Sequence, residues 1–339
     1  MDSKTADRSA SDTQKEGAVR LVALEKGVCR EWEGQEAIAE LARAVKRPTA
    51  RLWVDLCSPE PAVLAEVSTI LGLHPLLAED LTERDQRAKL DQIGGLVHLV
   101  LFSLGFDDGA VYERELDFVL GERFLLTSHS KWWDPRLTRH LKLGPEDALK
   151  RGPDYLLWAL ADDVIDSYFP ILDLLGDEID ELEDQVVAKA DRALLERLFA
   201  LKRELIQVRR VTAPEREMFN VLSSRVESVI SPELQLYYRD AYDHLIRLTD
   251  ELDTYRELAS ATLDAYLSTV NNNLSLIMKR LTGVTVVVAG VGSIAGIFGM
   301  SEAQTAFRFD EGFGFWFVAA GSLLVAGLAV TFLHRIDWI

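Results

Sequence analysis

One face of a long helical segment near the C-terminus carries polar and small side chains, where a coiled coil would carry leucine or isoleucine. Alternate steps of four and three residues stay on one helix face, and here they define eleven positions that we call the pore stripe: Asp264, Ser268, Asn271, Ser275, Met278, Thr282, Thr285, Ala289, Gly292, Gly296 and Gly299. Such a face could line a path for a hydrated cation, and a ring of Met278 and the adjacent Leu281 could close that path by dewetting. Tight helix packing explains the glycines equally well. It does not explain Asp264, Asn271 and Ser275 on the same face, so the stripe favours a pore.

Two uncharged runs predict that this segment enters a membrane. Residues 281–300 and 313–333 hold no charged side chain, and each run has about the 20 residues that a helix needs to cross a bilayer. Basic side chains precede the first run and follow the second, whereas the loop between them carries Glu302, Asp310 and Glu311. By the positive-inside rule, both termini face the cytoplasm and the loop lies outside. Because two helices cannot enclose a pore, a conducting chain must oligomerise around a shared axis.

Composition excludes several classes of function. The chain has 339 residues with 37 basic and 55 acidic side chains, and its net charge of −18 argues against a nucleic-acid partner. The sequence shows no phosphate-binding loop, HExxH motif or nucleophile–base motif, so we expect neither an enzyme nor an organic cofactor. Two cysteines and six scattered histidines predict neither a disulfide framework nor a compact zinc site.

The part before the membrane divides into an α/β region and a helical region. After a polar tail, 1–16, which we expect to be disordered, residues 17–150 form the predicted α/β cytoplasmic domain. Its expected strands are 19–24, 52–55, 96–104 and 116–127, and its expected helices are 36–45 and 61–71.

Residues 151–231 predict a helical hairpin region, with ten acidic residues and no lysine or arginine between 162 and 184. This acidic segment is a solvated helix face, a cation-attracting surface, or both. A stalk helix, 232–300, then runs without proline after Pro232 and includes the first membrane helix, 281–300. The loop 301–312, the second membrane helix 313–333 and a cytoplasmic tail 334–339 complete the predicted order.

Several motifs, in order along the chain, together resemble one protein family. The segment GIFGMS at 296–301 is similar to the G-M-N signature of the CorA family of divalent metal cation transporters (2-TM-GxN type). The segments HPLLAED at 74–80 and QRAKL at 86–90 resemble the family's HPLxxED…QRxK sequence. Further resemblances are DYLL at 154–157 with DEIDELE at 177–183, and RDAYDH at 239–244 with LDAYLS at 263–268. The C-terminal HRIDW at 334–338 is similar to the zinc-transporting ZntB branch.

The resemblance implies a fold and a set of sites. It implies a homopentamer with a CorA-like cytoplasmic funnel, in which the first membrane helix lines the pore and the second forms an outer ring. Gly299, Met300 and Ser301 would hold a hydrated divalent ion at the pore mouth. Asp80 and Asp240 fall where the family has acidic residues that bind a regulatory metal between subunits, and carboxylates are suitable ligands for Mg²⁺. Ser301 departs from the usual asparagine and offers a hydroxyl in place of a carbonyl oxygen.

These observations predict a channel or transporter for Mg²⁺, Co²⁺ or Zn²⁺ in a bacterial-type plasma (inner) membrane, gated by cytoplasmic metal. It would be a multi-pass protein with membrane lipid around it, and the divalent cation would be both substrate and regulator. A ZntB-like zinc transporter, with or without coupling to protons, is the first alternative. A membrane-anchored cytoplasmic sensor is the second, and it leaves the polar half of the pore stripe unexplained.

Overall fold

The computed structural model describes residues 17–83, 86–107, 109–142, 144–188, 190–224, 230–299 and 313–335. The chain divides into two compact units. The first unit comprises Met1–Glu181 and Arg197–Ala259, and the second comprises Leu182–Glu196 and Ser260–Ile339.

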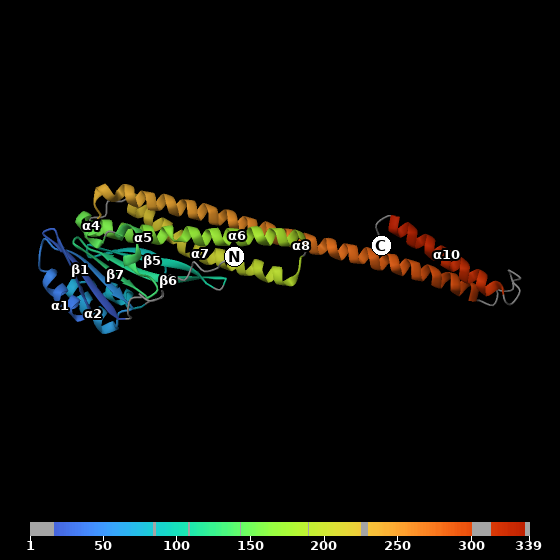
Figure 1. The fold of residues 1–339 in the computed structure, drawn as a ribbon, viewed down its shortest axis with the longest axis horizontal. Helices are drawn as coiled ribbons and strands as arrows, with labels where there is room; N and C mark the ends of the chain where they lie inside the picture. Colours follow the sequence, from blue (N-terminus) through green and yellow to red (C-terminus); the bar gives the residue numbers. More distant parts are fainter. Residues whose placement is uncertain are drawn as a thin grey trace. The chain divides into compact units, whose positions relative to one another are not determined.

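A mixed sheet of seven described strands forms the centre of the first unit (Figure 1). The strands are β1 (Ala18–Glu25), β2 (Val28–Glu33), β3 (Arg51–Cys57), β4 (Lys89–Ile93), β5 (Leu96–Asp107), β6 (Ala110–Leu120) and β7 (Phe124–His129). They lie in the order β2-β1-β3-β7-β6-β5-β4, and β3 and β7 are parallel while the other described pairs are antiparallel. The short β4 begins at Lys89, opposite Val100, so it does not extend along the later residues of β5.

Helices bury both faces of this sheet. Because successive strand residues point to opposite faces, β3 buries Trp53 on one face and Val54 on the other, each 0% exposed. Helices α1 (Gly34–Ala44), α2 (Pro61–Leu71) and α3 (Pro75–Asp80) cover the face that contains Val54. Helices α4 (Pro145–Arg151) and α5 (Pro153–Asp166) pack on the sheet as well, with α5 in contact with β3, β5, β6 and β7. Two short 3-10 turns, Pro135–Leu137 and Arg139–Leu141, precede α4.

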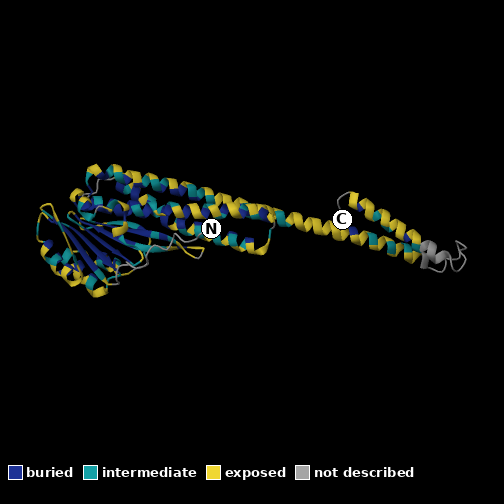
Figure 2. Cartoon of the chain, in the orientation of Figure 1, coloured by how far each residue is buried: buried dark blue, intermediate teal, exposed yellow. Residues whose placement is uncertain are grey.

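The rest of the described chain is helical. Its helices are α6 (Tyr168–Ala188), α7 (Arg192–Ser224), a 3-10 turn at Pro232–Leu234, α8 (Gln235–Gly299) and α10 (Phe313–Arg335). Among the described residues, Pro232–Ile297 is the helix that is long and apolar enough to cross a membrane, and Ala319–Arg335 forms a shorter apolar helix. The C-terminal half of α8 and the described part of α10 expose most of their side chains in the single chain (Figure 2).

The structure confirms the α/β region, the helices predicted at 36–45 and 61–71, and the long helix after Pro232. The prediction of a single strand at 116–127 is wrong. The segment belongs to two antiparallel strands, β6 and β7, which are joined by a turn where Gly121 N–H donates to Phe124 O at 2.9 Å. The first part of the predicted helical region 151–231 contains two successive helices, since α5 ends before Ser167 and α6 starts at Tyr168. The proposed domain bounds stay a prediction.

Candidate functional site

The pore stripe lies along α8, within the second unit. From Asp264 to Gly296 each stripe residue is exposed in the single chain. A Cβ added at Gly292 or Gly296 would meet no atom within 4 Å, so no contact inside this chain requires a glycine there. The Thr285 hydroxyl donates its proton within the helix, to Leu281 O at 2.7 Å. Its oxygen lone pairs therefore remain available on the exposed face.

The predicted gate residues are Met278, which lies on this face, and the adjacent Leu281. Met278 is 60% exposed and Leu281 is 59% exposed, although both are large apolar side chains. Exposure of such residues costs free energy in water, and it is expected where helices of other copies or lipid cover them. Gly299 is the last residue of α8. Met300, Ser301, Glu302, Asp310 and Glu311 lie outside the described residues.

Asp80 is half-buried at the end of α3 and already has a cation beside it. Lys89 Nζ lies 2.6 Å from Asp80 Oδ2, and Gln86 Nε2 donates to Asp80 Oδ1 at 3.1 Å. Desolvation by burial opposes ionisation, but the bonds from Lys89 and Gln86 outweigh it and lower the pKa of Asp80 below its ordinary value. Asp80 is therefore a carboxylate at neutral pH, and its charge is balanced within the chain.

Lys89 also contacts a second acid, because its Nζ lies 3.3 Å from Asp91 Oδ2. Asp80, Asp91 and His98 each place a ligand atom within 4.8 Å of the others. The ammonium group of Lys89 thus supplies the positive charge at this cluster. Asp91 and His98 were not predicted from the sequence, although the QRAKL segment contains Lys89 itself.

Asp240 is exposed on the part of α8 that belongs to the first unit. Within the described residues, no hydrogen bond or ion pair joins it to Asp80. Four residues later, His244 Nδ1 lies 2.9 Å from Asp166 Oδ1. The single chain therefore presents the two predicted regulatory acids separately.

The start of the acidic segment is neutralised by an arginine from outside it. Arg139 binds Asp162 Oδ2 at 2.6 Å and also pairs with Asp166, and His140 Nε2 lies 3.0 Å from Asp162 Oδ2. Asp162, Asp166 and His244 could place three ligand atoms around a metal ion. With Arg139 in contact with two of these acids, the cluster is an internal ion-pair network. Burial raises the pKa of the neighbouring Asp163.

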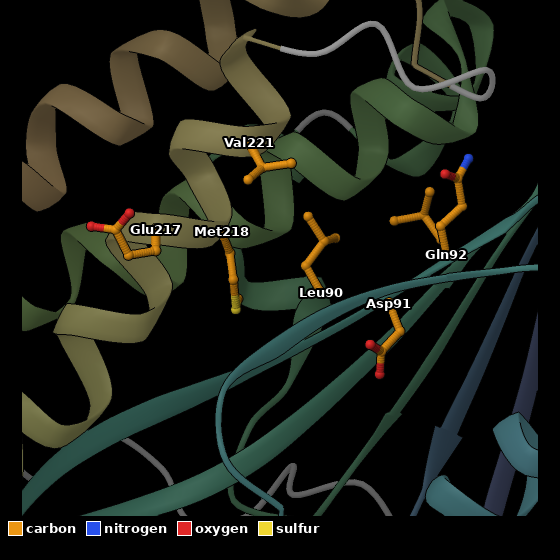
Figure 3. A pocket seen from close by; sticks show the side chains of 7 residues that line it. Leu90, Asp91, Gln92, Glu217, Met218 and Val221 are labelled. Atoms are coloured by element: carbon orange, nitrogen blue, oxygen red, sulfur yellow. The ribbon is translucent and has the colours of Figure 1, made fainter.

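A pocket of about 390 Å³ lies between β4 and α7 in the first unit (Figure 3). Its inner wall is apolar, with Leu90 and Val221 pointing toward each other and Met218 beside them, whereas the Glu217 carboxylate points away. The carboxylates of Asp91 and Glu217, which line this pocket, do not point toward a common centre. The pocket is therefore a gap in packing with a polar rim and not a cation site.

The comparisons with known proteins assign the fold and the family. The sequence model of the family described as "CorA-like Mg2+ transporter protein" matches residues 50–335, which is most of the chain. The chain belongs to the CorA family. This membership confirms the resemblance predicted from the motifs, and it makes the protein a divalent cation transporter of a membrane.

Relatives and solved structures agree with the CorA assignment. The chain is 30% identical over 283 residues to the "Cobalt/magnesium transport protein CorA" of Thermotoga maritima, covering 82% of this chain and 80% of that relative. It is 25% identical over 183 residues to the "Zinc transport protein ZntB" of Cronobacter sakazakii, covering 52% and 55%. The structure of the CorA magnesium transporter from Methanocaldococcus jannaschii aligns with this chain at a TM-score of 0.76 and 24% identity. The alignment covers 96% of this chain and 100% of that structure. The last comparison confirms the predicted CorA-like fold class.

Proposed function

We propose that this CorA-family chain assembles as a homopentamer in which five copies of α8 surround one conduction path for divalent cations. The observation that carries the proposal is the pore stripe, which is polar, then small, and exposed along its described length. A face of this kind gains its partners from other copies, and a shared axis brings five identical stripes together. Helix α10 would lie outside this ring, in contact with lipid.

The proposed path needs no chemical energy source. At −100 mV a divalent ion gains about 4.6 kcal/mol on entering the cell, which is twice the value for one charge. Both termini would lie in the cytoplasm of a bacterial-type cell, with 301–312 outside, as the distribution of basic side chains favours. The metal is then substrate and regulator, and the first unit is the cytoplasmic sensor of that metal.

Assembly is tested by mass. The detergent-solubilised protein is expected to have about five times the chain mass of 38.0 kDa. Mass photometry or native mass spectrometry measures this value, and flux of Mg²⁺, Co²⁺ and Zn²⁺ into liposomes tests transport on the same preparation. A monomer or dimer that conducts would contradict the shared pore.

The selectivity of the pore mouth is tested at Ser301. If the Ser301 side chain contacts the hydration shell of the ion, Ser301→Asn supplies a longer acceptor and changes the order of flux among Mg²⁺, Co²⁺ and Zn²⁺. If backbone carbonyls hold the ion, Ser301→Ala is nearly silent. Met278→Ala serves as a comparison, because a wider apolar ring should raise leak of all three ions without changing their order. Unchanged order in Ser301→Asn and unchanged flux in Ser301→Ala would remove Ser301 from the site.

Zinc is the second candidate for the physiological substrate. The similarity to ZntB covers about half of this chain, and the similarity to the cobalt/magnesium transporter covers most of it. We therefore rank magnesium or cobalt first. A pH gradient applied across the liposomes tests proton coupling, since a coupled zinc transporter would show zinc flux that depends on that gradient.

A further inference from the structure

A carboxyl group is completely buried beside β5, just beyond the residues of β5 that pair with β4. Glu215 of α7 is 0% exposed, and Tyr168, the first residue of α6, is 1% exposed. Both contact the backbone of Phe102 on β5, two residues beyond the last β5 position that is paired with β4. Neither group takes part in the proposed cation path.

These two side chains take over the backbone pairing that β4 does not provide. Phe102 N–H donates to Glu215 Oε1 at 3.0 Å, and the Tyr168 hydroxyl bonds to Phe102 O. Buried backbone groups need such partners because an unpaired donor or acceptor in the interior is costly. Glu215 and Tyr168 therefore replace a neighbouring strand and attach two helices to the open edge of β5.

The number of protons in this network determines the charge of Glu215. The Tyr168 oxygen lies near three acceptor oxygens, namely Phe102 O and, at 3.1 and 3.0 Å, Glu215 Oε1 and Oε2. One hydroxyl proton can serve one of them, and the bond to Phe102 O uses it. A proton on Glu215 can then be donated to the Tyr168 oxygen, so that every contact is satisfied. Without that proton, carboxylate lone pairs face the lone pairs of the hydroxyl.

We propose that Glu215 is a proton-binding site, which is occupied at neutral pH and which, on losing its proton, releases α6 and α7 from the edge of β5. The ligand is the proton itself. The site lies away from Asp80 and Asp240 in sequence and uses none of their contacts.

The surroundings of Glu215 support a neutral acid. Burial raises its pKa to about 8, although the bond from Phe102 N–H lowers it, and a bond from Tyr168 lowers it only when that hydroxyl turns from Phe102 O to the carboxylate. Titratable and charged side chains on the elements around the network include Asp166 on α5, Tyr168 on α6, His98 on β5, Glu113 and Glu115 on β6, Arg87 before β4, Arg209, Arg210 and Arg216 on α7, and Asp253 on α8. The three arginines of α7 nearest to Glu215 in sequence have other partners, since Arg210 pairs with Glu113, Arg209 pairs with Asp253, and Arg216 donates to Thr249.

A pocket lies beside the Phe102 end of this network. A pocket of about 670 Å³ is lined by Phe102, Val211 and polar side chains that include Gln86 and Glu115. Val211 is one helical turn before Glu215 on α7, and Phe102 is the residue to which Glu215 is bonded. Water in this pocket would therefore reach the edge of the network.

The test compares Glu215→Gln with the parent in the full-length protein. A glutamine keeps the shape of the protonated acid, since its oxygen accepts from Phe102 N–H and its NH₂ donates to Tyr168. In the parent, folded Glu215 keeps its proton up to a pKa of about 8, whereas Glu215 of the unfolded chain loses it above the ordinary pKa of 4.5. The stabilisation from the bound proton is therefore complete below pH 4.5 and is lost as the pH rises to about 8. The unfolding temperature of the parent should fall across that window by about 5 °C or more relative to Glu215→Gln, and the difference should level off above pH 8.

Infrared spectra and amide exchange give direct readings of the same site. At pH 7 the parent should show a protonated-carboxyl band that Glu215→Gln lacks, and its Phe102 amide should lose protection between pH 7 and 9. Glu217→Gln is the matched control, because Glu217 is on the same helix but exposed. It should keep the band and the pH dependence of the parent. Identical spectra and identical pH profiles in the parent and Glu215→Gln would overturn the proposal.

Discussion

Replacing Gly292 by leucine is expected to reduce divalent cation flux at least tenfold, to the level of empty liposomes. In the proposed pentamer, five leucine side chains would enter the part of the path that the pore stripe keeps narrow and small, and an apolar ring there excludes water and ions. The single chain has no contact at this position that leucine would disturb, because a Cβ at Gly292 meets nothing within 4 Å. Loss of flux would therefore come from contacts between copies, and not from misfolding of one chain.

The chain offers a matched control for this prediction. Gly290 is also on α8 and also has open space around an added Cβ, but two residues of helix rotate it by about 200° away from the stripe. Gly290→Leu makes the same chemical change on the opposite face and should keep flux within about twofold of the parent. Flux of Mg²⁺ into liposomes, measured at equal protein density and with the oligomer mass checked, separates the two faces. Equal loss in both variants would contradict the assignment of the pore stripe to the conduction path.

The sequence predicted the parts of this fold that depend on local periodicity. The helix 61–71 coincides with α2, and the long helix after Pro232 is present because no proline or early glycine interrupts it. Apolar runs located β1, β3 and β5, each of which is buried along most of its length. Strands β2 and β4 were missed because they are at the edges of the sheet and most of their side chains are partly or fully exposed, which leaves no apolar run to detect.

The contacts around the candidate sites could not be predicted in this way. Phe102 and Glu215 are separated by 113 positions, and only the packing of α7 on the sheet brings them together. Lys89 and Asp80 are nine positions apart, and they meet only because β4 begins beside the end of α3. The family resemblance therefore singled out Asp80 as a candidate, but the ion pair that balances its charge required coordinates. The pore stripe is the opposite case, since helical spacing alone places its residues on one face.

Replacing Lys89 by methionine is expected to strengthen binding of the regulatory cation about tenfold, which corresponds to about 1.4 kcal/mol. In the described chain the Lys89 ammonium neutralises Asp80 from 2.6 Å, so a divalent ion that binds Asp80 has to compete with an internal cation. Methionine keeps much of the side-chain length and removes the charge. Asp80 would then lack its counter-charge, and Mg²⁺ shared with Asp240 of a neighbouring copy would replace it. The measured quantity is the Mg²⁺ concentration that half-protects the full-length protein from proteolysis and half-inhibits flux.

Two comparisons make the competition specific. Lys46→Met removes an equal charge from an exposed position of the same unit and should leave the half-protecting concentration unchanged. Asp80→Asn together with Asp240→Asn should abolish the protection by Mg²⁺, and adding Lys89→Met to that double variant should have no further effect, because the pair whose competition is measured is gone. If Lys89→Met requires as much Mg²⁺ as the parent, Lys89 is a structural partner of Asp80 and not a competitor for its cation. If the double variant responds to Mg²⁺ like the parent, Asp80 and Asp240 are ordinary surface acids and the sensor lies elsewhere in the first unit.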